Sequence, residues 1–153
     1  MEKLLNLEYN QQIKIENNIY TVTAMLKFIE GSSYWLEYIL KDNNTCEEYF
    51  LDVEPSGKCA IHKMLNINME LDLHILYENE LYELFQKGNA KIQTYFGYTD
   101  VGLKDEMEYY EYKNKDKLFT IEKWKDIMEI SSGKYVDKNK IKILKIEDDN
   151  YRL

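Results

Sequence analysis

Two glutamates in similar settings are the residues of this chain whose type and spacing could do chemistry. Glu37 lies in the stretch YWLEYIL, where it shares one face of a predicted strand with Trp35 and Ile39, because side chains alternate between the two faces of a strand. Glu111 lies in the similar stretch YYEY. Two carboxylates within about 10 Å of each other, one with a raised pKa, could perform acid–base or hydrolytic catalysis.

The same residues also have a structural interpretation. A glutamate flanked by aromatic residues on a strand can accept hydrogen bonds from tyrosine hydroxyls, lysine or backbone groups, and so fix the strand register. It can also discourage unwanted edge pairing. We interpret Glu37 as such a register and network residue, assign no catalytic residue, and keep ligand recognition by Glu37 open as an alternative.

Other common chemistries have little support in the sequence. The only histidines are His62 and His74, and the Cys59-x-x-His62 spacing lacks the second ligand pair of a structural zinc site. Strand alternation also places Cys59 and Ile61 on the face opposite His62. No nucleophile elbow, phosphate-binding loop or dinucleotide motif occurs. We therefore predict no metal site and no cofactor.

Composition constrains the partners and the compartment. The net charge of −8 disfavours binding to a phosphate backbone, so we expect no nucleic-acid partner. No apolar run approaches the ~20 residues of a membrane helix, and the N-terminus does not resemble a signal peptide. Cys46 and Cys59 flank a predicted hairpin turn too far apart to pair, so free thiols and a cytoplasmic location are expected.

The elements that must position these residues are mostly strands. Apolar and polar residues alternate with period 2, and short turns rich in Gly, Asn, Asp and Ser separate the runs, which is typical of antiparallel meanders. These runs predict strands at residues 12–16, 19–30, 34–41, 47–54, 58–65, 107–113, 118–122 and 140–146.

Two segments are ambiguous between helix and strand. Residues 78–87 could be a helix that ends at Gly88, but we prefer a hairpin with its turn at Lys87-Gly88 because AKIQTYF is rich in strand-forming residues. Residues 121–131 carry apolar side chains at helical spacing, which favours a short helix over 121–130. Residues 96–105 read as a loop. Nothing marks a linker, so we expect one domain over residues 1–153.

The chain also carries an internal echo. WLEYILKDNNTCEEYFLDVE and YYEYKNKDKLFTIE share an order of aromatic residue, Glu-Tyr, turn, apolar strand and glutamate, and the strands end at Glu54 and Glu122. This echo predicts two related halves, at about 8–65 and 80–146. We expect a mostly β fold in which two antiparallel β-meander halves pack as a sandwich or as half-open barrels, with at most one or two short helices.

The same residues resemble the uncharacterised bacterial domain-of-unknown-function family 4178. The similarity rests on Trp35-x-Glu37-Tyr38-x-Leu40, the aromatic strand that ends at Glu54, Gly88, Glu111-Tyr112, and Glu122-x-Trp124 followed by Glu129-x-Ser131-x-Gly133. A glycine expected near Thr23 or Ala24 is absent, and Phe50-Leu51 stands in place of a Trp-Leu pair. The resemblance covers nearly the whole chain and implies an architecture without an established activity.

We predict a non-enzymatic binding or protein-interaction module of the bacterial cytoplasm. Its partner would be a protein or a small molecule in an aromatic groove between the halves. The alternatives are a hydrolase-like enzyme that uses Glu37 and Glu111, or a self-assembling structural subunit; the oligomeric state stays open. The candidate binding residues are Trp35, Glu37, Tyr38, Tyr109, Glu111, Tyr112, Glu122 and Trp124.

Overall fold

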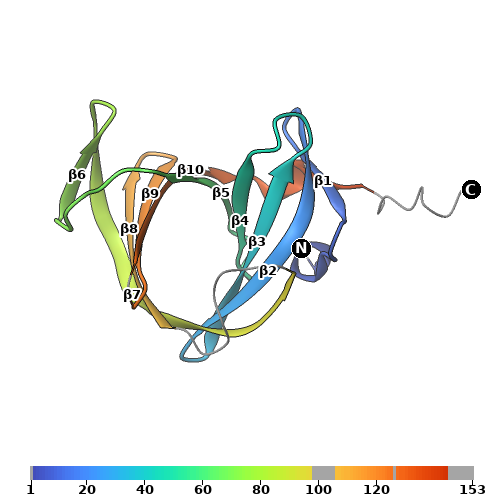
Figure 1. Ribbon diagram of the computed structural model, residues 1–153, viewed down its shortest axis with the longest axis horizontal. Coiled ribbons are helices and arrows are strands. Elements are labelled where there is room, and N and C mark those ends of the chain that lie inside the picture. Colours follow the sequence, from blue (N-terminus) through green and yellow to red (C-terminus); the bar gives the residue numbers. More distant parts are fainter. Residues whose placement is uncertain (1, 98–105, 126, 145–153) are drawn as a thin grey trace, which may run out of the picture.

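The protein is one antiparallel sheet that closes on itself. The computed structural model describes residues 2–97, 106–125 and 127–144. The strand order is β11-β1-β2-β3-β4-β5-β10-β9-β8-β7-β6, and an additional pairing of β2 with β7 closes eight strands into a barrel (Figure 1). The strands are β1 (Gln12–Ile15), β2 (Asn18–Glu30), β3 (Ser33–Asp42), β4 (Glu48–Val53), β5 (Cys59–Leu65), β6 (His74–Tyr77), β7 (Glu80–Gly97), β8 (Glu106–Asn114), β9 (Lys117–Lys123), β10 (Met128–Val136) and β11 (Ile141–Ile143).

The mostly β prediction is confirmed, whereas the sandwich of two halves is not. Strands β2–β5 and β7–β10 are two successive four-stranded meanders, but β5 pairs with β10 and β2 pairs with β7, so they share a single wall. The internal repeat stays a prediction. The only helices in the described residues are the short 3-10 helices η1 (Glu2–Asn6) and η2 (Lys138–Lys140).

The barrel closes where a bulge in β2 meets a glycine in β7. Val22 pairs with Leu40 and Ala24 pairs with Ile39, so Thr23 is the extra residue, and the alternation of β2 shifts there. Gly97 pairs with Ala24, has φ of 79°, and would place a Cβ 2.7 Å from the Ala24 Cα atom. Only glycine fits this close approach without a backbone shift.

The predicted hairpin at Lys87-Gly88 is wrong, and so is the alternative helix over residues 78–87. Strand β7 runs unbroken through this point, and Gly88 pairs with Tyr109 on β8. The true turn is Glu78-Asn79, which joins β6 to β7; both residues have positive φ, as a type I′ turn requires. Gly88 is not a turn residue; the absence of its side chain makes room for the Tyr109 hydroxyl.

The predicted helix over residues 121–130 is also wrong. This segment is the end of β9, a tight turn and the start of β10, and the backbone N–H of Trp124 donates to the Ile127 carbonyl at 2.8 Å. Ile121 and Ile130 are buried cross-strand partners, so their spacing reflects the hairpin. Ile127 is 58% exposed, which a core-facing helix position would not be. Residue 126 lies outside the described part, as do residues 98–105 of the predicted loop and 145–146 of the last predicted strand.

Two apolar layers cover the outside of the barrel. Helix η1, β1 and β11 cover β2–β5 with a cluster that includes Leu4, Ile13, Tyr38 and Leu51. Strand β6, the start of β7 and the segment 66–73 cover β8–β10 around Tyr112 and Phe119. Cys46 is exposed, Cys59 is buried, and both are free thiols, as predicted. No helix within the described residues is long and apolar enough to cross a membrane.

Candidate ligand-binding cavity

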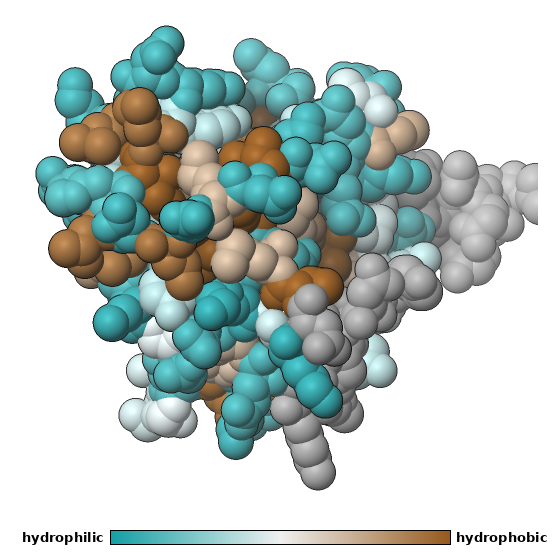
Figure 2. Space-filling model, turned by 60° about the vertical axis from the view of Figure 1, so that its left-hand side comes forward, coloured by the Kyte–Doolittle hydropathy of each residue, from teal (hydrophilic) through white to brown (hydrophobic). Residues whose placement is uncertain are grey.

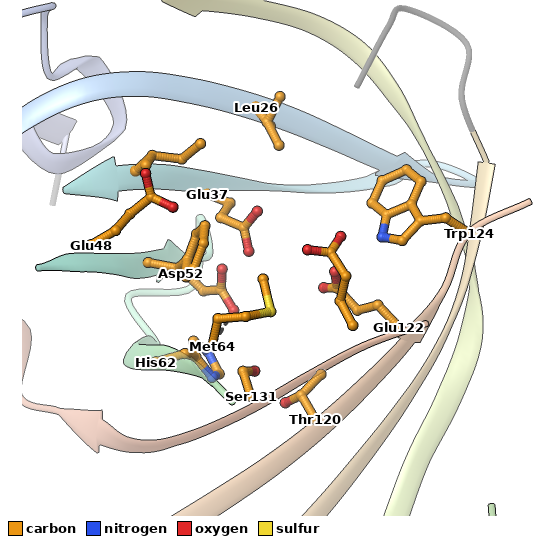
Figure 3. Close-up of a pocket in the computed structure, with 13 residues that line it drawn as sticks. Leu26, Glu37, Glu48, Asp52, His62, Met64, Thr120, Glu122, Trp124 and Ser131 are labelled. Carbon is orange, nitrogen blue, oxygen red and sulfur yellow. Dashed lines mark hydrogen bonds and ion pairs between the residues drawn. The ribbon is translucent and has the colours of Figure 1, made fainter. Parts of the chain in front are cut away.

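Acidic side chains from four strands face the inside of the barrel. Glu37 on β3 pairs directly with Asp52 on β4, and Glu122 on β9 pairs with Glu129 on β10. Residues paired across a ladder point to the same face of the sheet, so each pair enters the interior together. The labelled carboxylates of Glu37, Asp52 and Glu122 point into one space (Figure 3).

This space is a cavity of about 170 Å³. Exposed Glu48 and the 39% exposed Met64 line it, so it opens to solvent on their side. Apolar and aromatic side chains form much of the remaining wall. The lining residues are Leu26, Glu37, Ile39, Glu48, Phe50, Asp52, His62, Met64, Thr120, Glu122, Trp124, Glu129 and Ser131.

An inner aromatic cluster lies next to the cavity and supports its Trp124 wall. Trp35 stacks on Phe28 with ring centroids 5.3 Å apart and meets Tyr109 edge-on at 5.6 Å. The ring centroids of Trp124 and Phe28 lie 6.2 Å apart. The Tyr109 hydroxyl donates to Glu30 Oε1 at 2.5 Å and is thereby held away from the cavity acids. This part of the barrel interior is filled with side chains, as is usual for small barrels.

A histidine–aspartate pair stands on one wall. His62 Nε2 lies 2.8 Å from Asp52 Oδ2, and His62 is only 5% exposed. Burial lowers the pKa of His62, but the charge and hydrogen bond of Asp52 oppose this effect and raise the pKa overall. Gly133 pairs with His62, and a Cβ there would lie 2.8 Å from His62 Nδ1. The absence of a side chain at Gly133 therefore leaves room for the His62 imidazole.

Burial and mutual repulsion raise the pKa values of two cavity carboxyls, Glu37 and Glu122. Burial, reinforced by the charges of Asp52 and Glu129, raises the pKa of Glu122 to about 8. The same causes, burial first and then the charge of Glu122, raise the pKa of Glu37 well above its ordinary value. Carboxyls that can gain or lose a proton near pH 7 are frequent in functional sites.

Four buried polar atoms have no hydrogen-bond partner within the described part of the chain. They are Asp52 Oδ1, His62 Nδ1, Thr120 Oγ1 and Trp124 Nε1, and all four residues line the cavity. The Trp124 indole lies near enough to Glu122 to lower the pKa of that carboxyl, although the contact does not have hydrogen-bond geometry. Buried polar groups are normally paired, so this concentration in one cavity calls for an explanation.

The structure separates the candidate residues identified from the sequence into three groups. Glu37, Glu122 and Trp124 line the cavity. Trp35, Tyr109 and Glu111 also face the barrel interior, but they do not line the cavity. Burial, followed by the charge of Asp52, raises the pKa of Glu111 to about 7. Tyr38 and Tyr112 face outward into the covering layers. Glu37 is therefore brought together with Glu122 in the cavity, whereas Glu111 lies outside it.

Sequence reasoning missed Asp52, His62, Thr120, Glu129 and Ser131. One signal was available for Asp52, which alternates with Leu51 and Val53 in the same way that Glu37 alternates with Leu36 and Tyr38. Both acids lie on strands whose other face is apolar, so both must point into the barrel. His62 on β5 and Thr120 on β9 lie on strands that the sequence does predict, whereas placing Glu129 and Ser131 requires β10, which the sequence pattern did not indicate.

The chain belongs to the family described as Domain of unknown function (DUF4178), whose family model matches residues 9–138. The match begins before β1 and ends within η2, so it includes the whole barrel and every residue that lines the cavity. This confirms the resemblance inferred from the sequence motifs. Neither the curated proteins nor the solved structures gave a match.

Proposed function

We propose that this barrel is a binding module that takes up a small molecule in the cavity between β3, β4, β9 and β10. The observation that carries the proposal is the concentration of unpartnered polar atoms on Asp52, Thr120 and Trp124 around a solvent-accessible space. Ligand sites in proteins combine an apolar wall with a few converging polar groups, and this lining has the same composition. A ligand that pairs with these atoms would offset their burial.

A binding screen with a cavity-filling variant tests this proposal. We expect that some members of a library of small fragments shift the amide signals of Thr120 and Ser131 and the indole N–H signal of Trp124 in two-dimensional NMR spectra. Ser131→Leu fills the cavity from β10 and should abolish these shifts. Ser132→Leu, one residue further on the opposite face of β10, is the matched control and should leave them unchanged. Shifts that persist in Ser131→Leu would contradict the proposal.

Acid–base catalysis in the same cavity is a second candidate. Its support is that Glu37 and Glu122 both have raised pKa values and line one accessible space. Glu111, which the sequence favoured as the partner of Glu37, does not line this cavity. An enzyme would turn over a bound fragment, so chemical change of a fragment by the wild type but not by Glu122→Gln would favour this candidate over a pure binding module.

Self-assembly through an edge strand is a third candidate, supported by a different surface. Leu73, Leu76 and Leu81 are 52–66% exposed on and beside the β6–β7 hairpin, and β6 is an edge of the sheet. Figure 2, which brings this side forward, shows apolar side chains gathered on it. Sedimentation that gives a dimer in the wild type and a monomer in Leu76→Lys would favour this candidate.

A further inference from the structure

We propose that the ligand of the cavity is a small organic cation, a protonated amine on an apolar body, held between the carboxylates of Glu37 and Glu122 and the ring of Trp124. This inference rests on the proposed binding function and adds the chemical class of the ligand.

Acidic groups dominate the lining, and His62, which also lines the cavity, is paired with Asp52. Five of the thirteen lining residues are acids, and no lysine or arginine is among the described residues that line the cavity. Glu37, Asp52 and Glu122 approach from three different strands, so their oxygens surround the space. A protonated amine has three N–H donors and no acceptor, which matches a set of converging carboxylate oxygens.

The rest of the lining favours an organic cation over a bare metal ion. Leu26, Ile39, Phe50 and Met64 supply apolar contacts, and the Trp124 indole is an aromatic part of the wall. A hard metal ion uses oxygen ligands and gains nothing from such a wall, whereas an alkyl or aryl ammonium ion buries its body against apolar groups and its charge against an aromatic ring.

Two of the four unpartnered atoms, on Thr120 and Asp52, match the same ligand. Thr120 is 8% exposed, and its Oγ1 atom can accept a hydrogen bond from an ammonium group, as can Asp52 Oδ1. Trp124 Nε1 is a donor, which an ammonium ion cannot satisfy. The neighbouring Glu122 carboxyl could accept from it once Glu122 has lost its proton, and the indole already lowers the pKa of that group.

The volume suits a ligand with one aromatic ring. The cavity is about 170 Å³, and a dry cavity of ~150 Å³ in another protein holds benzene. Benzylamine is therefore a suitable probe, and benzyl alcohol and benzoate are probes of nearly the same shape with zero and negative charge.

Binding of a cation to these carboxyls must depend on pH. Burial and neighbouring carboxyls raise the pKa values of Glu37 and Glu122, that of Glu122 to about 8. A bound cation favours their charged forms, so it should displace protons and bind more tightly as the pH rises from 6 to 8.5. An aliphatic amine stays protonated over this range, as lysine does. The other groups that titrate around the two glutamates are Glu48 and Asp52 on β4, His62 on β5, Glu111 on β8 and Glu129 on β10.

NMR titrations of the indole N–H signal of Trp124 with the three probes test the inference. At pH 8 we expect benzylamine to bind at least tenfold more tightly than benzyl alcohol, and benzoate to leave the signal unmoved. Glu122→Gln should weaken benzylamine binding at least tenfold. Glu111→Gln, which changes an inward-facing glutamate outside the cavity, should change the Kd less than twofold. The Kd should fall at least fivefold between pH 6 and pH 8.5.

The possible failures are distinguishable. Benzyl alcohol binding as tightly as benzylamine, or a Kd that does not depend on pH, would overturn the amine assignment and leave a cavity that binds neutral molecules. Fragments that bind in the cavity while benzylamine does not would have the same meaning. If neither the fragments nor benzylamine shift the signals of the cavity residues, both the amine assignment and the proposed function are wrong.

Discussion

The outer and inner faces of the barrel wall differ in whether their buried polar groups have hydrogen-bond partners. On the outer face, the Tyr38 hydroxyl donates to the Leu4 carbonyl at 2.7 Å and accepts from the Leu7 N–H at 3.2 Å. The Tyr112 hydroxyl donates to the Asp72 carbonyl at 2.8 Å. These two tyrosines pin the N-terminal segment and the segment 66–73 to the barrel, so the hydrogen bonds of the outer face hold the covering layers.

The inner face has the opposite character around the cavity. Glu37, the neighbour of Tyr38 in sequence, faces other carboxyls, and the pKa of Glu37 is raised by burial and by their charges. Thr120, the neighbour of the fully buried Phe119, has no partner for its hydroxyl in the described part of the chain. Proteins keep such unfavourable arrangements mainly at functional sites. The outer face therefore stabilises the fold, whereas the inner face holds buried polar groups that find no partner within the described residues.

Removing the side chain of Tyr38 should break the outer face most severely. Tyr38→Ala should lower the free energy of unfolding by roughly 3–5 kcal/mol, because a 1% exposed ring is lost from the core. Tyr38→Phe keeps the ring and should cost about 1–3 kcal/mol, since the Leu7 N–H loses its acceptor. Urea denaturation measures both. A Tyr38→Phe midpoint equal to that of the wild type would mean that the outer hydrogen bonds do not stabilise the fold.

The inner face predicts a stability that falls as the pH rises. The pKa values of Glu111 and Glu122 are raised from 4.5 to about 7 and about 8, so above pH 4.5 the unfolded chain releases protons that the folded chain keeps. His62 acts in the same direction, because the stability from its protonation is lost above its raised pKa. Together these groups predict a loss of stability on the order of 5 kcal/mol between pH 5 and pH 8.

Urea denaturation at a series of pH values measures this dependence. Glu122→Gln removes one of the titrating groups and should make the dependence shallower, whereas Tyr38→Phe should shift the whole curve without changing its slope. Stability that rises from pH 5 to pH 8 would show that the cavity carboxyls are charged and satisfied in the folded protein.

Crowding the inner wall should have a smaller effect. Gly133→Ala places a methyl group against the His62 ring and the Ile61 carbonyl, so the wall must shift at a cost of about 1–2 kcal/mol. Ser132→Ala is the control on the neighbouring residue and should have little effect. Thermal denaturation compares the two variants, and equal melting temperatures would mean that the inner wall adapts without strain.

The smallest effect is expected for an exposed ion pair on the surface. Lys117 Nζ lies 2.6 Å from Glu80 Oε1, but both side chains are more than one third exposed. Solvent screens such pairs, so Lys117→Ala should leave the denaturation midpoint unchanged within error. A clear loss of stability would mean that a charged bridge between the start of β7 and β9 helps to hold the covering layer on the barrel.

Strands with one apolar face could be predicted from the sequence, whereas closure of the barrel could not. The alternation around Glu37 identified β3 and the shared face of Trp35, Glu37 and Ile39, and all three side chains do point inward. Closure depends on pairing between β2 and β7, about 70 residues apart, and on the bulge at Thr23. No local pattern reports a pairing over that distance.

Predictions from local sequence patterns were wrong where a contact with a distant part of the chain determines the residue type. Gly88 matched the chemistry of a turn but makes room for Tyr109, and Ile121 and Ile130 matched a helix but are partners across a hairpin. Glu37, Glu122 and Trp124 could be proposed from local sequence patterns. Their grouping with Asp52 and His62 required the register of four strands.

The effect of Glu37→Ala on stability at pH 8 tests the contrast between the two faces most directly, with Tyr38→Phe as the matched control on the opposite face. If Glu37 belongs to a cavity arranged for a ligand, the variant removes a buried acid from among like charges. The denaturation midpoint should then be unchanged or raised, which corresponds to a gain of up to ~2 kcal/mol in the free energy of unfolding. Tyr38→Phe should lower it. A loss of about 1–3 kcal/mol in Glu37→Ala, as for a residue that fixes strand register, would contradict this account.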